Sequence, residues 1–525
     1  MFDPSSNSTQ DPRVVSAIVV AGGIVCAALL GSSIVEGGLL TFAVLGAVAT
    51  ITIVLTLQDR IWVLIPVFWY FPGRLGFLPL PFSVRELAVL FAGGLFVILL
   101  SLRFIRAAAE MEFIDWIVFI NVGYLTTVFI RNPVGLSAFG SAMVGGRPYF
   151  DALIGFVAFV VLSRMTLQPA LAKVLPLFSC AAQVGISLLG ALAHYLPSTA
   201  PLIARIYSGV DVSEYVRQAS GSEDSDESRV TNLLGGSEAG ILTLVSYFPP
   251  LSLLLPVHPV RFLGFVAVCA GVGLTGFRNG IFLMVFAFVA SAYFRTGLTK
   301  ALIVSITAVL AVFAIVAAHD FGLPLPATAQ RALSFLPGTW DEAAKGDAER
   351  SSEWRFYMWD VVLSTDTYIH NKMFGDGFGF SAEELQIMED AQSGGAGFVG
   401  AAEQESFLIQ GAFHSGPLSA VRYVGVVGLA LYLVLLVTAA VYAWKLIRRS
   451  HRTDYFPLAL FVGIPAVYEP LQYTLVFGAF DSGFPTTLFV CGMLKLISKG
   501  CDAHRPQTQL IAVAPRSLAK AQPAT

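Results

Sequence analysis

Charged residues are scarce in this chain. Of its 525 residues only 13% are charged, whereas 56% are hydrophobic, and the mean hydropathy is +0.73. Apolar runs of about 20 residues recur along the sequence, which excludes an ordinary soluble globular protein of this size. The formal net charge of −3 gives no sign of a nucleic-acid partner.

Cysteine is also scarce. The five cysteines are scattered, four in apolar runs and one in the tail, so we expect neither a disulfide framework nor a metal cluster. The sequence has no zinc motif, no Walker loop and no serine-hydrolase elbow. The polar stretch from Met1 to Arg13 lacks a basic n-region, and the apolar run after it has no cleavage site. We therefore expect a retained helix rather than a signal peptide.

What the sequence has in abundance is hydrophobic segments. Fourteen runs are candidates for membrane-spanning helices. Several are short or broken by proline and glycine, so we expect about 12 to 14 crossings and an all-α polytopic membrane protein. The candidates are 14–34, 39–58, 61–80, 87–102, 114–130, 149–163, 174–195, 240–257, 262–276, 281–294, 301–318, 423–444, 456–475 and 484–498.

Basic residues in the short loops predict the orientation. They fall on alternate connections between the apolar segments, and the side that carries them is expected to be the cytoplasm. If all the segments cross, both termini lie on that side and the two longest loops lie on the opposite face. The basic residues are Arg60, Arg103, Arg106, Arg164, Lys173, Arg261, Arg295, Lys300, Lys445, Arg448, Arg449 and Arg452.

These boundaries divide the chain into four parts. A transmembrane helix bundle with one outer loop comes first, followed by a large polar loop, the C-terminal transmembrane helices and a disordered cytoplasmic tail. The outer loop contains an acidic stretch, Gly221 to Ser228, which we expect to be solvated and mobile. The parts are 1–319 with the outer loop at 196–238, then 320–421, 422–498 and 499–525.

The large loop at 320–421 is expected to be partly helical and functional. Its fifteen Asp and Glu residues against five Lys and Arg suit the non-cytoplasmic side. We predict helices over 346–368 and 406–418, and a turn over 375–380. The glycines of that turn resemble a phosphate-binding loop only superficially, because no strand precedes them.

Arginines on the outer face are candidates for function, because the positive-inside rule makes them unexpected there. Arg278 joins two apolar segments, and an ionisable residue at membrane depth is costly. Arg131 and Arg147 flank another short outer loop. Arginine grips a phosphate through a planar fork of donors, so several arginines converging there would suit a lipid diphosphate. The alternative for each is a snorkelling interface anchor.

The large loop adds further arginines and aromatic residues. Arg331 and Arg355 belong to this set, and Arg355 lies between Trp354 and Trp359. At spacing i, i+4 on a helix, Arg355 and Trp359 share one face. The alternative for Arg355 is cation–π packing against the tryptophans.

Three further residues could take part in chemistry near the membrane surface. His414 is the only histidine near the return of the large loop to the membrane, and a histidine accepts a proton from a hydroxyl near neutral pH. A structural role is the alternative. Glu469 and Asp481 fall in or beside the apolar region 456–498, where they line a cavity or pair with a buried donor; we assign them no catalytic role.

With these motifs in this order, the chain resembles the bacterial O-antigen ligase and polysaccharide polymerase superfamily of polytopic glycosyltransferases. The likeness covers about 270 to 435 and rests on topology elsewhere. At positions 414 and 415 this chain has His-Ser, whereas the family more often has His-Asn. The residues that carry the likeness are Thr275 to Gly280, Arg331 to Phe335, Arg355 with Trp359, the glycines 375, 377 and 379, and His414-Ser415-x-x-Leu418 leading to Gly425 and Gly428.

The resemblance implies a GT-C-like, inverting glycosyltransferase of the bacterial inner membrane with a periplasmic active site. Its donor would be a glycan on undecaprenyl diphosphate, and its acceptor a glycan or a lipid-linked molecule in the bilayer. A chain-length regulator and a flippase are further partners in such systems. The diphosphate-linked donor supplies the energy, so no cofactor, nucleotide or metal is required.

The resemblance also implies roles for residues. Arg278 and Arg355 would bind the diphosphate and stabilise charge on the leaving group. His414 would act as general base on the acceptor hydroxyl or orient it. Arg331 is the reserve candidate for the second arginine. Substrate-binding roles would fall to Arg331, Arg147, Trp354 and Trp359; for the tryptophans an interfacial aromatic belt is the alternative.

Two alternatives stay open at this point. A polymerase and a ligase share these motifs, and the segment Arg331 to Pro337 favours an exopolysaccharide or O-antigen polymerase. A polytopic transporter of a polysaccharide or small solute would also fit the number of spans and the broken helices. The transporter would depend on Glu469, whereas the glycosyltransferase would depend on His414. A structural membrane scaffold would depend on neither.

Overall fold

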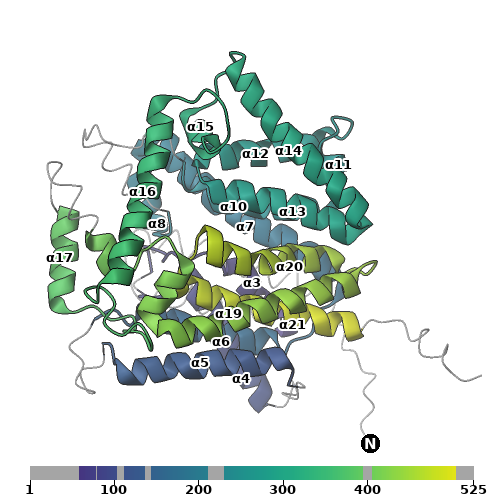
Figure 1. Ribbon diagram of the computed structural model, residues 1–525. Helices are drawn as coiled ribbons and strands as arrows, with labels where there is room; N and C mark the ends of the chain where they lie inside the picture. Colours follow the sequence, from purple (N-terminus) through teal and green to yellow (C-terminus); the bar gives the residue numbers. More distant parts are fainter. Residues whose placement is uncertain are drawn as a thin grey trace, which may run out of the picture. The chain divides into compact units, whose positions relative to one another are not determined.

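A computed structural model shows a chain built from helices (Figure 1). In the described part of the chain, β-structure is limited to two isolated bridges, Leu75 with Tyr207 and Val144 with Phe380. The chain divides into two compact units after Pro66. The first unit contributes the 3-10 helix η1 (Gln58–Val63) and the start of α3 (Leu64–Phe68). The described residues are 58–78, 80–102, 111–135, 144–210, 230–393 and 405–503.

In the described part of the chain, six helices are long and apolar enough to cross a membrane, which confirms the expected all-α membrane architecture. A helix rises 1.5 Å per residue, so about 20 residues span the hydrocarbon core. Large apolar side chains remain exposed along these helices, as lipid-facing surfaces require. The six are α4 (Val84–Ser101), α5 (Phe113–Arg131), α7 (Pro169–Tyr195), α13 (Arg278–Thr296), α14 (Leu298–Asp320) and α19 (Gly416–Ser450).

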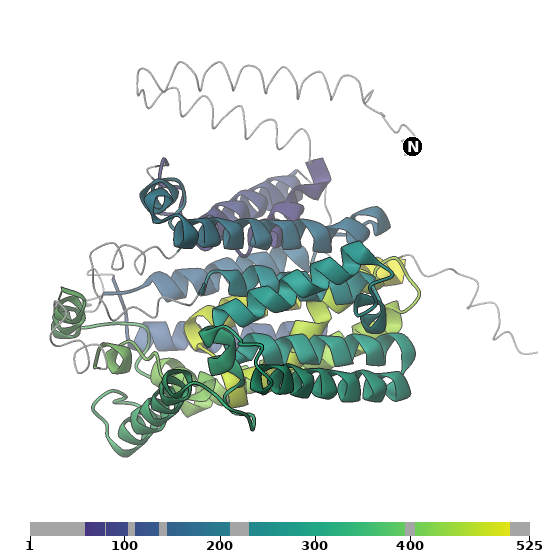
Figure 2. The same ribbon diagram turned by 90° about the horizontal axis from the view of Figure 1, so that it is seen from above.

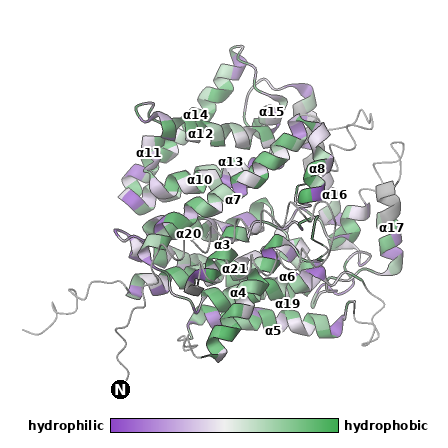
Figure 3. Cartoon of the chain, turned by 180° about the vertical axis from the view of Figure 1, so that it is seen from behind, coloured by the Kyte–Doolittle hydropathy of each residue, from purple (hydrophilic) through white to green (hydrophobic). Residues whose placement is uncertain are grey.

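Shorter or more polar helices account for most of the other predicted segments. They are α6 (Arg147–Leu162), α10 (Leu233–Tyr247), α12 (Pro259–Thr275), α20 (Phe456–Leu471) and α21 (Phe480–Ala503). The short helices η3 (Pro197–Thr199), α8 (Ala200–Ile206) and α11 (Pro250–Leu253) lie between them. Figure 3 shows hydrophobic residues along the helices and hydrophilic residues near many helix ends.

One predicted segment is wrong as a single helix. Over 61–80 the chain is helical only as far as Phe68 and then irregular. Pro72 and the prolines at 79 and 81 explain this, because a proline lacks the N–H of the helix ladder and disfavours helical backbone in the residue before it. The segment 14–34 and nearly all of 39–58 lie outside the described residues.

Within the second unit, α19 packs against α5, α20 and α21, and α21 also lies along α6 (Figures 1 and 2). A second group forms around α10, which packs against α7, α12 and α13, while α13 packs against α14. Helix α20 contacts α19 as well as α7, α10 and α13 and so joins the two groups.

The large loop folds into one long helix and two shorter ones that precede α19. These are α15 (Ala327–Leu333), α16 (Glu342–Ser364) and α17 (Ala382–Ser393). Helix α16 is the helix predicted over 346–368. The helix predicted over 406–418 is wrong: a helical turn over 405–409 ends before α19 begins at Gly416. Gly411 and His414 interrupt it with positive φ angles of 70° and 51°.

Two other predictions concern the ends of segments. The C-terminal helix α21 continues to Ala503, so the tail predicted from 499 begins later than expected. The rest of that tail and the acidic stretch Gly221 to Ser228 lie outside the described residues.

Candidate functional site

The site is built on an irregular start to α19. Gly425 has φ 71° and kinks the helix after its first turns. The turn at 372–377 docks on this kink through backbone hydrogen bonds: Asp376 N–H donates to the Arg422 carbonyl at 3.0 Å and Gly377 N–H to the Tyr423 carbonyl at 2.9 Å. A Cβ at Gly375 would lie 2.5 Å from the Tyr423 carbonyl oxygen. These glycines therefore serve a close backbone approach rather than a nucleotide.

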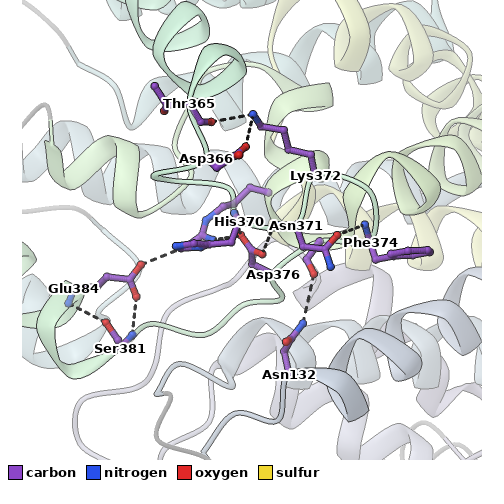
Figure 4. Close-up of polar contacts among 12 residues, drawn as sticks. Asn132, Thr365, Asp366, His370, Asn371, Lys372, Phe374, Asp376, Ser381 and Glu384 are labelled. Atoms are coloured by element: carbon purple, nitrogen blue, oxygen red, sulfur yellow. Dashed lines mark hydrogen bonds and ion pairs between the residues drawn. The ribbon is translucent and has the colours of Figure 1, made fainter.

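An ion pair between Arg422 and Asp376 also holds this turn in place. Figure 4 shows Asp376 and Glu384 in this group of polar contacts. Arg422, on α19 and 3% exposed, donates to Asp376 at 2.8 Å and lies 3.6 Å from Glu384. The Asp376 carboxylate also accepts from the backbone N–H groups of His370 and Asn371, both at 2.8 Å. Arg422 is thus paired within the protein, although its Nε is buried without a hydrogen-bond partner among the described residues. Removing one member of the ion pair would leave the other charge buried.

His414 lies directly before α19, in the left-handed region of backbone space at φ 51°. Its neighbours hold it there. The Phe413 side chain is fully buried, and its carbonyl accepts from the Trp359 indole N–H at 2.9 Å. The Gly416 carbonyl accepts from the Tyr473 hydroxyl at 2.6 Å. The backbone on both sides of the half-buried His414 side chain is therefore held in place.

The surroundings of the imidazole are aromatic. Its centroid lies 6.0 Å from the Phe407 ring and 5.7 Å from the Phe477 ring. Burial lowers the pKa of His414 below its usual 6.5, and the positive charge of Arg355 lowers that pKa further. The neutral imidazole is thereby favoured near pH 7, and a neutral imidazole nitrogen accepts a proton.

Arg355 projects from α16, one turn before Trp359. Its side chain is half-buried, and its Nε is buried without a hydrogen-bond partner among the described residues. Burial lowers the pKa of Arg355, and the charge of Arg278 acts in the same direction. Buried donors are normally satisfied, so an unpaired guanidinium donor calls for an explanation.

Arg278 is the first residue of α13. The chain turns into this helix at Gly276, whose left-handed backbone (φ 68°) caps α12. The guanidinium makes one long hydrogen bond, to Ser334 at 3.4 Å, and lies 5.8 Å from the Phe335 ring. It lines a cavity of about 340 Å³ whose other walls come from α16 and the end of α15.

Arg278, Arg355 and His414 come from three separate elements of the structure. Arg355 interacts electrostatically with both of the other residues. Among the described residues, neither Arg278 nor Arg355 forms an ion pair with a carboxylate, although Glu349 and Glu353 line the Arg278 cavity. Two neighbouring guanidinium groups without a paired carboxylate, beside a neutral imidazole, form an arrangement suited to an anion and a proton transfer.

The other predicted site residues have different positions. Trp354 and Trp359 pack partly against the apolar cluster around Met358 and Phe413. The indole N–H of Trp359 is engaged with Phe413, so Trp359 positions the His414 backbone. Arg331 is half-buried on α15, one turn before Phe335.

Arg147 lines a different cavity, away from the residues around Arg278. It pairs with the buried carboxylate of Glu86 and donates to the Pro81 carbonyl at 3.1 Å. The arginines predicted to converge therefore fall into two groups rather than one.

Two contributors, Glu238 and Tyr473, were not singled out from the sequence. Glu238 on α10 lies close enough to Glu469 on α20 for their carboxyl groups to interact electrostatically. Glu469 lines a cavity of about 320 Å³ between α19, α20 and α21, as predicted for a cavity-lining acid, and Phe477 lies at its edge. Tyr473 belongs to a π-helical turn, η4 (Gln472–Val476), and such turns are frequent at functional sites.

No protein-family description matches this chain, and no curated protein is similar to it in sequence. In the part of the chain that the structure describes, no group of three or more His, Cys, Asp or Glu side chains is arranged to hold a metal ion.

Proposed function

We propose that this protein is a membrane glycosyltransferase that transfers a glycan from undecaprenyl diphosphate to an acceptor hydroxyl. The observation that carries the proposal is that Arg355 interacts electrostatically with both Arg278 and His414. Two arginines without carboxylate partners suit the diphosphate, and a histidine kept neutral beside them suits the acceptor hydroxyl.

In the proposed reaction, the acceptor oxygen attacks the anomeric carbon of the donor sugar as its proton passes to an imidazole nitrogen of His414. The bond between the anomeric carbon and the diphosphate oxygen breaks, with inversion. The negative charge gained by the departing diphosphate is stabilised by Arg278 and Arg355, whose positions are fixed before the reaction. Single substitution of such a donor typically costs about 10²- to 10³-fold in rate.

We further propose a GT-C-like arrangement in the bacterial inner membrane, with both termini in the cytoplasm and the site on the periplasmic face. Basic residues at the opposite end of the helices support this orientation. Lys495 and Lys499 near the end of α21 and Arg164 after α6 lie together there, as the positive-inside rule requires of a cytoplasmic face.

Polymerisation is favoured over ligation on the sequence of the segment Arg331 to Pro337. Both activities use the same donor chemistry, so the Arg278, Arg355 and His414 site serves either one. They differ in the acceptor, which is lipid-linked in a polymerase and a different molecule in a ligase.

Transport is the second candidate, and one specific observation favours it. Glu238 and Glu469 are acids on apolar helices whose carboxyl groups interact with each other, and neither carboxyl group forms a hydrogen bond or ion pair with another described side chain. Intramembrane carboxyl groups are costly and often mark ion or proton pathways. Glu469→Gln should abolish activity if the protein is a transporter and leave glycan assembly largely intact if it is not.

The test compares the glycans that living cells make with different variants of the protein. Cells lacking the protein are supplied with wild type, His414→Ala or His370→Ala, with membrane expression checked for each. His370 is a matched control because it is 69% exposed and outside the site. We expect the His414 variant to match cells without protein, with short lipid-linked repeats accumulating for a polymerase and full-length lipid-linked polymer for a ligase. A His414 variant that behaves like wild type would exclude the proposed mechanism.

A further inference from the structure

A second basic cavity lies apart from the Arg278 site. It encloses about 490 Å³ and is lined by two short chain segments and the first residue of α6. We call it the Arg74–Arg147 cavity. None of its lining residues lines the Arg278 cavity. The lining residues are Pro72, Gly73, Arg74, Pro81, Arg147, Ser208 and Gly209.

The walls of this cavity are held by hydrogen bonds between distant parts of the chain. The Arg74 N–H donates to the Ser208 hydroxyl at 2.8 Å, and the Ser208 N–H donates to the Arg74 carbonyl at 2.9 Å. The Gly76 N–H donates to the Ile206 carbonyl at 3.0 Å. Gly73 approaches Gly209 so closely that a side chain at Gly73 would collide with its backbone. The cavity is therefore preformed rather than a gap between loose loops.

Its charge is positive. Arg147 and Arg85 share two carboxylates: Glu86 pairs with Arg147, and Asp151 lies 3.0 Å from Arg85 and 4.0 Å from Arg147. The Arg147 side chain nevertheless remains 47% exposed toward the cavity side. Arg74 adds a further cation, whose side chain has no hydrogen bond or ion pair with the other described residues. Counted over the described residues, two guanidinium groups thus line one cavity with one net positive charge left over.

The cavity is attached to the His414 site through a continuous set of contacts. Val144, just before α6, forms a β-bridge with Phe380, with both hydrogen bonds at 2.9 Å. The Tyr149 ring lies 4.8 Å from the Phe378 ring, which lies 4.6 Å from the Tyr423 ring on α19. The Arg74–Arg147 cavity therefore opens at the same end of the helices as His414.

We propose that the Arg74–Arg147 cavity binds the diphosphate of a second lipid-linked molecule, the glycan acceptor. This inference rests on the proposed function and makes the enzyme a polymerase. A polymerase must hold two lipid diphosphates at once, with the acceptor sugar reaching His414 while its own diphosphate is held elsewhere. A rigid basic cavity at the same end of the helices, separate from the donor arginines, meets that requirement.

Binding stoichiometry tests this directly. The full-length protein in lipid nanodiscs is titrated with undecaprenyl diphosphate, and bound ligand is counted by native mass spectrometry. We expect two molecules on wild type, one on Arg74→Glu, and one on the Arg278→Ala, Arg355→Ala double variant. Arg131→Gln is the matched control, because Arg131 is an arginine at the same end engaged with the Phe374 carbonyl, and it should retain two.

Inorganic diphosphate provides the second arm. If it fills the Arg74–Arg147 cavity and undecaprenyl diphosphate does not displace it, the cavity binds a free anion and the lipid-acceptor proposal is wrong. Two lipid molecules on Arg74→Glu would also overturn it. Loss of binding only in the double variant would instead leave the donor site standing, so failure of this inference is distinct from failure of the proposed function.

Kinetics supply an independent readout. In a transfer assay with a lipid-linked acceptor, Arg74→Gln and Ser208→Ala should raise the KM for the acceptor. For Arg74→Gln the KM should rise about tenfold to hundredfold. The KM for the donor and kcat should change little, because neither residue touches the reacting atoms. An unchanged acceptor KM for Arg74→Gln would contradict the assignment.

Discussion

Two groups of cations at opposite ends of the helices have opposite surroundings. Near the end of α21, Lys495 is 1% exposed, pairs with the buried Asp115 of α5 and lies 3.7 Å from Glu112. At the other end, Arg278 and Arg355 lie near each other and form no ion pair with a described carboxylate. Arg422 belongs to the first kind, since Asp376 neutralises it.

The presence or absence of a carboxylate partner separates cations that the protein neutralises from cations that it does not. A buried cation with its carboxylate is satisfied by the fold and has no capacity left for a ligand. Two like charges that face each other destabilise the free protein, so their retention points to a bound anion that neutralises them. The predictions below test whether the two groups differ as this comparison requires.

The largest effect should come from the paired group and fall on stability. Lys495→Met leaves the Asp115 charge buried without its partner, which should reduce the free energy of unfolding by about 3–5 kcal/mol. Thermal unfolding in detergent measures it, with exposed Lys445→Met as the control. Adding Asp115→Asn should recover part of the loss; a double variant less stable than Lys495→Met alone would contradict the pairing.

The unpaired group should show the reverse pattern. Arg355→Ala should lower the transfer rate about 10²- to 10³-fold, because a preorganised donor to the leaving group is lost. Its melting temperature should equal or exceed that of wild type, since a like-charge contact is removed. The rate is followed with purified protein, and Arg131→Gln is the control. A destabilised variant with normal activity per folded molecule would assign Arg355 to the structural group.

A smaller effect on kcat is expected from Tyr473, which holds the backbone next to His414. Tyr473→Phe removes the hydrogen bond to the Gly416 carbonyl, worth about 1 kcal/mol. We expect kcat to fall by up to about tenfold, corresponding to 1.4 kcal/mol, with the KM for the donor unchanged. Tyr432→Phe, which loses a contact with Thr487 deeper in the bundle, is the matched control. Equal kcat values for the two variants would remove Tyr473 from the site.

The subtlest effect is on the pH profile. Burial and the charge of Arg355 lower the pKa of His414. A general base acts in its neutral form, so the transfer rate should fall only as the pH drops through this lowered pKa. Arg355→Gln removes the charge, raises the pKa of His414 toward its usual value and should move the acidic limb of the residual rate to higher pH. A shift toward lower pH would show that His414 and Arg355 are not neighbours.

Sequence patterns anticipated the features that depend on local order. Runs such as 301–318 and 423–444 are helical because apolar side chains of about that length suit a bilayer. Arg278, Arg355 and His414 were predicted as one site, and in the structure Arg355 interacts electrostatically with each of the other two. The break at His414 was missed, because a helical pattern continues through Ser406 to Leu418 and only the tertiary contacts of Phe413 and Gly416 impose the turn.

Features that depend on distant contacts escaped the sequence. Arg147 was grouped with Arg278 because both lie on one predicted face, but the neighbours that decide its position are Glu86 and the segment around Ser208. Glu238 drew no attention, since its partner Glu469 lies far along the chain. Arg422 was not singled out either, since its partner Asp376 lies 46 residues away in the sequence.

The most direct test of the central claim is made with purified protein. Undecaprenyl-diphosphate-linked glycan is added to wild type, Arg278→Ala, Arg355→Ala and His414→Ala, and the release of free undecaprenyl diphosphate is followed together with the growth of the glycan. We predict coupled release and growth with wild type, and losses of at least about 10²-fold in each variant. Transfer at wild-type rates by the three variants, or none by a folded wild-type protein given donor and acceptor, would contradict the account.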